Sequence, residues 1–145
     1  MALLANKVRS YINPVQPDES FKVATNAIAF VGSLIGANAT GFIDRIPGPG
    51  VNNAAFRVAG LSHASFSNVG GANAAFDVRV DRPNGADRFD VLAADPVTQA
   101  DILKVVFAED DGTIRRTDNA GTRCAAGTLY AINTDGTVAI KLLQP

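Results

Sequence analysis

The chain of 145 residues contains no tryptophan, one cysteine, one histidine and one methionine. A lone cysteine cannot close a disulfide within the chain and has no CxxC partner, which excludes a disulfide scaffold and a cysteine-based zinc or redox site. Lysine and glutamate, which favour helices, are scarce, whereas glycine, alanine, asparagine and aspartate are frequent. The composition therefore predicts an all-β protein made in a reducing cytosol.

The chain also has no excess of charge of one sign. It contains 13 basic and 14 acidic residues, and neither kind forms a block. This balance provides no electrostatic footprint for nucleic acid or for an anionic membrane. The most apolar segment, Ala27 to Gly36, is too short to cross a bilayer. Lys7 and Arg9 follow the first apolar stretch, whereas in a secretory signal they would precede it. We therefore expect protein partners, with no nucleic acid and no membrane among them.

The length of the chain suits one domain with one core. The first residues differ from the remainder of the chain. Residues 1–19 lack a period of two and contain Pro14 and Pro17. Their apolar side chains at helical spacing are Leu4, Val8, Tyr11 and Ile12. We interpret residues 1–19 as an N-terminal arm and residues 20–145 as a single β domain. The four apolar residues are candidate contacts with another subunit or a larger partner, and the alternative is a frayed terminus.

An apolar period of two begins near residue 21 and is clearest in AFDVRVD (75–81), where apolar and charged side chains alternate. That alternation predicts a strand with one buried face. The next segment, RPNGAD (82–87), contains the Asn-Gly pair that favours a tight hairpin turn. A second strand with Phe89 and Val91 facing inward should follow. The sequence therefore predicts a β-hairpin across residues 75–94.

Further short segments rich in β-branched and aromatic residues are predicted strands. They are FKVA (21–24), AIAFVG (27–32), TGFIDRI (40–46), AAFRVAGL (54–61), ASFSN (64–68), KVVFAE (104–109), GTIRRT (112–117), GTLYAIN (127–133) and GTVAIKLL (136–143). The glycines of GSLIGANATG (32–41) and IPGPG (46–50) are interpreted as turns. Thr98 and Asp101 have capping-box spacing, which predicts one helical turn. The fold class expected is a small β-barrel or β-sandwich of short antiparallel strands, with an extended N-terminal arm and at most one short helical turn.

The acidic run EDDG (109–112) is the most conspicuous candidate for chemistry. An EF-hand calcium loop around it would need an oxygen ligand where Phe107 stands and a bidentate glutamate where Asp118 stands, so that reading fails. The run instead predicts a solvated turn tip, where water leaves the proton affinity of carboxylates ordinary. Arg115 and Arg116, on the returning strand, should point to opposite faces.

Other candidate catalytic residues give weaker signals. His63 lies among serines without a GxSxG elbow and is predicted to be a surface or hydrogen-bonded residue. Cys124 begins an apolar strand and is predicted to pack in the core as a small hydrophobe. The glycine-rich segments match no phosphate loop. We therefore predict no catalytic residue, no cofactor and no metal site, and we expect that the protein is not an enzyme. A hydrolase is the weakest alternative.

Turn-and-strand motifs in the second half of the chain carry a resemblance. They are the strand, turn and strand of residues 56–80, the segment Thr98–Ile114 (TQADILKVVFAEDDGTI), the turn Asn119–Thr122, the strand Ala126–Ile132 (AGTLYAI) and the closing segment Asp135–Ile140 (DGTVAI). In this order they resemble the head decoration, or capsid cement, proteins of tailed bacteriophages. The resemblance covers roughly residues 56–142.

The resemblance implies a small β-barrel or sandwich that binds the outside of a viral shell and holds neighbouring capsomers together, with no cofactor and no reaction. The implied partners are the major capsid protein and further copies of the chain, with a trimer favoured over a dimer because such shells offer threefold sites. The location implied is the capsid exterior of the virion, after synthesis in the host bacterial cytoplasm. The candidate contacts of the arm with the capsid or another subunit are then Leu4, Val8, Tyr11 and Ile12.

Two other functions are compatible with the sequence. One is a structural component of a phage tail or fibre. The other is a small β-sandwich binding module, for example for carbohydrate. Only Tyr11 and Tyr130 could help to form an aromatic sugar platform without tryptophan, which argues against carbohydrate recognition.

Overall fold

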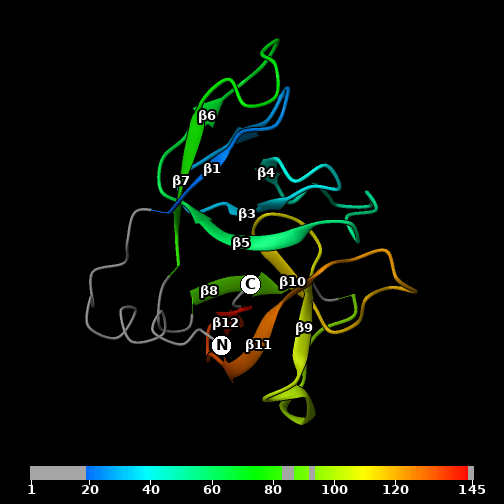
Figure 1. Ribbon diagram of the computed structural model, residues 1–145. Coiled ribbons are helices and arrows are strands. Elements are labelled where there is room, and N and C mark those ends of the chain that lie inside the picture. Colours follow the sequence, from blue (N-terminus) through cyan, green and yellow to red (C-terminus); the bar gives the residue numbers. More distant parts are fainter. Residues whose placement is uncertain (1–18, 83–86, 92–93, 144–145) are drawn as a thin grey trace, which may run out of the picture.

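The computed structural model describes residues 19–82, 87–91 and 94–143, and within them the regular structure is almost entirely β (Figure 1). The strands are β1 (Glu19–Lys22), β2 (Ile28–Ala29), β3 (Leu34–Ala37), β4 (Ile43–Arg45), β5 (Arg57–Ser62), β6 (Phe66–Ser67), β7 (Asp77–Asp81), β8 (Asp87–Val91), β9 (Val105–Ala108), β10 (Thr113–Arg115), β11 (Ala125–Ile132) and β12 (Val138–Leu142). The helical element among these residues is a 3-10 turn, η1 (Gln99–Asp101). The predicted all-β fold with at most one short helical turn is confirmed.

The strands form two main units, one above the other in Figure 1. Five strands make an antiparallel sheet in the order β1-β7-β5-β3-β4. Five others close into a barrel in the order β10-β8-β12-β11-β9, with β10 antiparallel to β9 and parallel to β8. β2 and β6 pair separately as a short ribbon. Closure satisfies both edges of every barrel strand, so the barrel presents no free edge for pairing with another chain.

Two apolar cores lie on opposite faces of the five-stranded sheet. One fills the barrel and reaches the sheet, joining Ile114 and Leu129 with Leu34. The other packs against the opposite face and includes Ile35 and Val78. Leu34 and Ile35 are neighbours on β3 that belong to different cores, and both are fully buried. β3 therefore connects the two cores as a strand buried on both faces.

The position of β3 corrects the prediction that residues 32–41 are only a glycine turn. Gly36 lies inside the strand, and a Cβ atom added there would stand 2.6 Å from the carbonyl oxygen of Arg57 on β5. Glycine at this position serves the close approach of two backbones. The prediction was wrong because a glycine that breaks a pattern in sequence can serve close packing inside a strand.

The predicted hairpin across residues 75–94 is also wrong. β7 pairs with β1 and β5, whereas β8 pairs with β12 and β10, so the connection between β7 and β8 leads from the sheet to the barrel. The central turn residues, 83–86, lie outside the described residues. The predicted alternation holds for Val78, Val80 and Phe89, which are buried, but not for Phe76, which precedes β7 and is exposed. An isolated two-stranded hairpin is marginally stable, and pairing on both edges within larger sheets buries more apolar surface.

The predicted helical turn is present as η1. The backbone N–H and the side-chain Oγ1 of Thr98 donate hydrogen bonds to Asp101 Oδ2 over 2.8 and 2.9 Å. The chain then enters β9 through Leu103, whose φ angle is +66°. No helix among the described ranges is long and apolar enough to span a membrane. The predicted contact residues Leu4, Val8, Tyr11 and Ile12 lie outside the described residues.

Candidate functional site

The three carboxylates of the acidic run have three different environments. Glu109 directly follows β9 and is buried, with only 9% of its side chain exposed. Asp110 Oδ1 accepts a hydrogen bond from the backbone N–H of Gly112 over 2.8 Å, as a turn-forming aspartate does. Asp111 Oδ2 accepts one from Ser33 Oγ over 2.8 Å and so joins the turn to the five-stranded sheet. The run is therefore not a single cluster of solvated acids.

The burial of Glu109 corrects the prediction that water screens all three carboxylates. Glu109 Oε2 lies 2.6 Å from Arg123 Nε and 3.4 Å from Arg115 Nε. Both arginine side chains are about nine-tenths buried. A carboxylate can stay charged in such a place because two guanidinium groups compensate it. Arg123 arrives from the far end of the β10–β11 loop, and that long-range contact has no local signature in the sequence.

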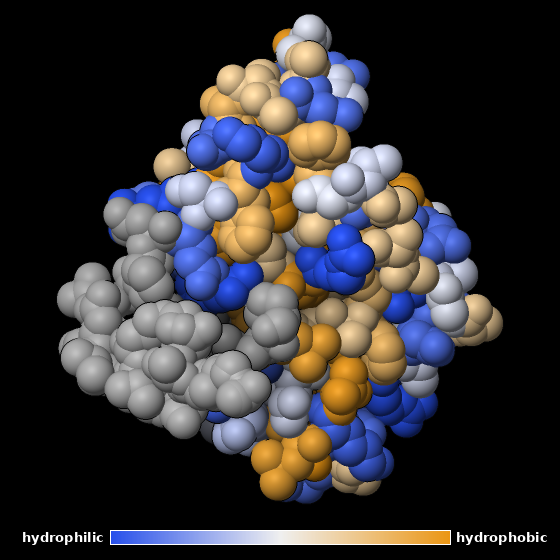
Figure 2. Space-filling model, in the orientation of Figure 1, coloured by the Kyte–Doolittle hydropathy of each residue, from blue (hydrophilic) through white to orange (hydrophobic). Residues whose placement is uncertain are grey.

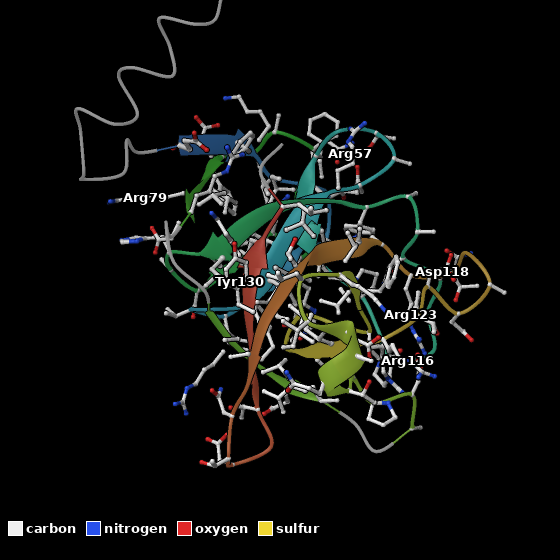
Figure 3. The ribbon with its side chains drawn as sticks, turned by 90° about the horizontal axis from the view of Figure 1, so that it is seen from below. Arg57, Arg79, Arg116, Asp118, Arg123 and Tyr130 are labelled. Carbon is white, nitrogen blue, oxygen red and sulfur yellow. The ribbon has the colours of Figure 1, made fainter. Side chains whose placement is uncertain are left out.

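Asp95 extends these contacts into a charged network. Its Oδ2 lies 3.1 Å from Arg123 Nη1 and accepts hydrogen bonds from the Thr117 hydroxyl, over 2.6 Å, and backbone N–H, over 3.1 Å. Arg116 Nε lies 3.4 Å from Asp95 Oδ1. Burial alone would raise the pKa of Asp95, but the hydrogen bonds from Thr117 and Arg123 outweigh it and hold the pKa below its ordinary value. Figure 3 shows Arg116 and Arg123 on the side of the molecule that carries Asp118.

The network balances two carboxylates, Glu109 and Asp95, against three guanidinium groups. Arginine is charged at any relevant pH and cannot accept a proton, so the pairing of these groups with the two carboxylates does not form an acid/base pair. Arg115 and Arg116, which were predicted to point to opposite faces of the returning strand, differ in burial. Arg115 is buried within the network, whereas Arg116 is half exposed. The arrangement fixes the β9–β10 turn, the β10–β11 loop and the segment before η1 to one another.

Asn53 forms a second set of contacts next to the charged network. Its side-chain amide donates to the carbonyl oxygens of Pro47 and Ala108, each over 3.1 Å, and its Oδ1 accepts from the backbone N–H of Cys124 over 2.7 Å. Its own backbone N–H donates to Thr122 O over 2.9 Å. One fully buried side chain thus ties the loop after β4 to β9 and to the start of β11.

A cavity of about 160 Å³ opens beside this network, between residues 50–52 and residues 119–123. Glu109 and Arg123 stand in its wall and are already paired with each other. The volume is smaller than the roughly 300–1,000 Å³ typical of small-molecule sites. The cavity therefore offers little room for a substrate beside two side chains whose charges are matched.

The remaining candidate nucleophiles are engaged elsewhere. His63 Nδ1 lies 3.0 Å from Asp81 Oδ1, while the neighbouring Ser62 hydroxyl donates to Ala64 O. His63 is thus a hydrogen-bonded surface residue, as predicted. Cys124 is buried as predicted, and burial raises the pKa of its thiol to about 11. Within the described residues no three His, Cys, Asp or Glu side chains are grouped so that they could hold a metal ion.

A different feature of the barrel exposes apolar side chains on its outer surface. Val105 faces outward from β9 and stands opposite Thr128 of β11. The N–H of Leu103 donates to the carbonyl oxygen of Leu129, which places Leu103 beside the next residue of β11, Tyr130. We define the outer apolar strip by its exposed side chains: Leu103 is 66% exposed, Tyr130 49% and Val105 46%.

The strip lies over β11 and over β9 with the turn that precedes it. Figure 2 shows apolar side chains gathered over β9 and that turn, and Figure 3 shows Tyr130 on β11. Sequence reasoning did not identify the strip as a candidate contact. A signal existed, because Val105, Val106 and Phe107 are consecutive apolar residues, and a strand that alternates faces must turn some of them away from the core.

No protein-family model, no curated protein and no solved structure compared with this chain gives a match. The described geometry and the sequence motifs are thus the basis on which a function can be argued.

Proposed function

We propose that the protein binds the outer surface of a tailed-bacteriophage capsid and stabilises the shell, in the manner of head decoration or cement proteins. The observation that carries the proposal is the location of the resembling motifs. Thr98–Ile114 forms η1, β9 and β10, Ala126–Ile132 lies within β11, and Asp135–Ile140 forms the last turn and most of β12. With β8 these strands close the barrel around one core. These three motifs thus build one structural unit of the kind that the resemblance implies, whereas the motif of residues 56–80 forms β5, β6 and most of β7 outside the barrel.

The surface of that unit suits attachment to a protein partner. The outer apolar strip provides contacts that do not depend on net charge, which is close to zero for the whole chain. The charged network and Asn53 hold the neighbouring loops in place, so little conformational entropy would be lost when they meet another surface. Symmetry on a shell repeats a modest contact many times, and multivalency then gives strong total binding.

The partners in this proposal are the major capsid protein and further copies of the chain. A trimer is favoured over a dimer because closed threefold positions recur on such shells. The location is the exterior of the virion capsid. The proposal includes no catalytic reaction, because the candidate nucleophiles are engaged in structural contacts or buried and Glu109 is paired with Arg123.

Cosedimentation with phage heads tests the proposal. Purified protein should bind expanded empty heads and bind unexpanded precursor shells poorly, and binding should persist in moderate salt because it does not rest on net charge. Isolated tails serve as the comparison particle. Equal binding to both kinds of shell, or its loss in moderate salt, would contradict cementing. Preferential binding to tails would instead support the alternative of a tail or fibre component.

A further inference from the structure

We propose that residues 1–18 of one copy of the chain bind the outer apolar strip of a neighbouring copy. The proposal concerns association between copies in solution and does not rest on binding to a shell. It assigns an acceptor surface to the four apolar side chains of the N-terminal segment, Leu4, Val8, Tyr11 and Ile12.

The size of the strip favours a short segment as its occupant. Three side chains that are about half exposed present on the order of 250 Å² of apolar surface, less than the largest patch on a typical monomer. A specific interface between two folded surfaces buries about 800 Å² on each partner. The strip alone is too small for such an interface, whereas a segment with four apolar residues matches it in size and chemistry.

The border of the strip does not oppose an apolar occupant. Lys104, between Leu103 and Val105, has Asp101 Oδ1 at 3.6 Å from its Nζ atom, so its charge has a partner that stays in place. Apolar side chains can cover the strip while Lys104 keeps its head group in water. The occupant gains apolar burial without leaving an unpaired charge beneath it.

The reach of the chain favours a neighbouring copy over the same copy. Figures 1 and 3 both place β1, which begins at Glu19, on the opposite side of the molecule from η1 and the start of β9. A domain of this length measures roughly 40 Å across, from the scaling of its radius of gyration. Ile12 can lie at most about 25 Å from Glu19 along an extended chain. Tyr11 and Ile12 therefore cannot reach Leu103 and Val105 of their own copy, but a neighbour can bring these two side chains to them.

Disulfide cross-linking between two different variants tests this directly. One variant carries Val8→Cys and the other carries Val105→Cys, and the two full-length proteins are mixed and mildly oxidised. The native Cys124 should not interfere, because it is 4% exposed and its thiol has a pKa of about 11. The matched control replaces Val105→Cys with Val69→Cys, a valine that is 67% exposed in the loop after β6, away from the strip.

The expected result is a mixed disulfide dimer that forms at least tenfold faster with Val105→Cys than with the Val69→Cys control. Equal rates with both acceptors would overturn the proposal. A chain that carries both Val8→Cys and Val105→Cys should give intermolecular products. A product cross-linked within one chain, and no mixed dimer, would show that the segment folds back on its own copy and would also overturn it.

Sedimentation equilibrium with charged substitutions provides a second, independent measurement. Val8→Asp and Leu103→Asp should each weaken self-association at least tenfold, and combining them should add little because both remove the same contact. Val31→Asp is the matched control, since Val31 is 69% exposed outside the strip. Unchanged association in both test variants, or effects that simply add, would contradict the proposal. Far-ultraviolet circular dichroism of each variant verifies that the domain remains folded.

Discussion

Glu109 Oε2 lies 2.6 Å from Arg123 Nε in a pair of side chains that are each about nine-tenths buried. Arg115 shares the same carboxylate oxygen from 3.4 Å, so one buried acid compensates two buried guanidinium groups. Within the described part of the chain, neither Glu109 Oε2 nor Arg115 Nε makes an aligned hydrogen bond. The contact between Glu109 and Arg115 is therefore mainly coulombic. The stability of the β9–β10 turn should therefore depend on the charge of Glu109 more than on its shape.

Replacement of Glu109 by Gln tests that dependence. The variant keeps the size of the side chain but leaves two buried arginines without their shared counter-charge, a change that typically costs about 3–5 kcal/mol of unfolding free energy. Urea denaturation measures it. Asp110→Asn, in the same turn but partly exposed, should change the unfolding free energy by less than about 1 kcal/mol. Equal effects of the two variants would show that the turn, and not the buried pair, determines stability.

Asp95 should contribute to the acid sensitivity of the fold. Because its pKa is lower in the folded chain than the ordinary 3.8, the unfolded chain binds this proton more readily. Its stabilising contribution is therefore complete above about pH 4 and is lost as the pH falls through the folded pKa. Asp95→Asn should lower stability at neutral pH and flatten the decline in acid, as measured by thermal unfolding between pH 2 and 7. The exposed Asp118→Asn variant is the control and should keep the parent's pH profile.

The thiol of Cys124 should react slowly in the native protein. A pKa of about 11, against an ordinary value of 9.0, lowers its thiolate fraction at pH 8 by about a hundredfold, and burial slows reagent access further. Labelling with iodoacetamide, followed by mass spectrometry, should give little adduct until denaturant is added. Rapid labelling without unfolding would show that the β10–β11 loop opens readily.

Asn53 should stabilise the loop region more than its exposed neighbour does. Asn53→Ala leaves the buried N–H of Cys124 and the carbonyl of Ala108 without their side-chain partner, and each such loss costs about 1–3 kcal/mol. Guanidinium denaturation should show a loss above about 2 kcal/mol. Asn52→Ala, which removes one hydrogen bond to the exposed Ala54 N–H, should cost clearly less. A loss no larger than that of Asn52→Ala would mean that water replaces the amide.

The acidic turn should not respond to calcium. Glu109 is held by arginines, Asp110 by Gly112 and Asp111 by Ser33, so the three carboxylates do not converge on one point. Millimolar calcium should leave the melting temperature unchanged in differential scanning calorimetry. A rise would mean that the folded state binds the ion, since such a ligand must stabilise it.

Several local features of this protein could be read from the sequence alone. Alternation in residues 75–81 located the buried side chains Val78 and Val80, and the spacing of Thr98 and Asp101 located η1. The apolar context of Cys124 predicted its burial. These features depend on periods and caps within a few residues, which local backbone geometry determines. The all-β class follows from the same short-range patterns.

Pairing partners and charge compensation were decided only in the tertiary structure. β7 and β8 adjoin in sequence but belong to different sheets, because each gains two distant neighbours there. Glu109 is buried because Arg123 returns to it from another loop, and without that contact the same carboxylate would belong in water. The sequence by itself determined the all-β class and most of the segments that become strands, but not β3, where Gly36 serves close packing inside the strand. Only the folded chain decided which strands meet and which charges are matched, because those free energies depend on contacts between residues far apart in sequence.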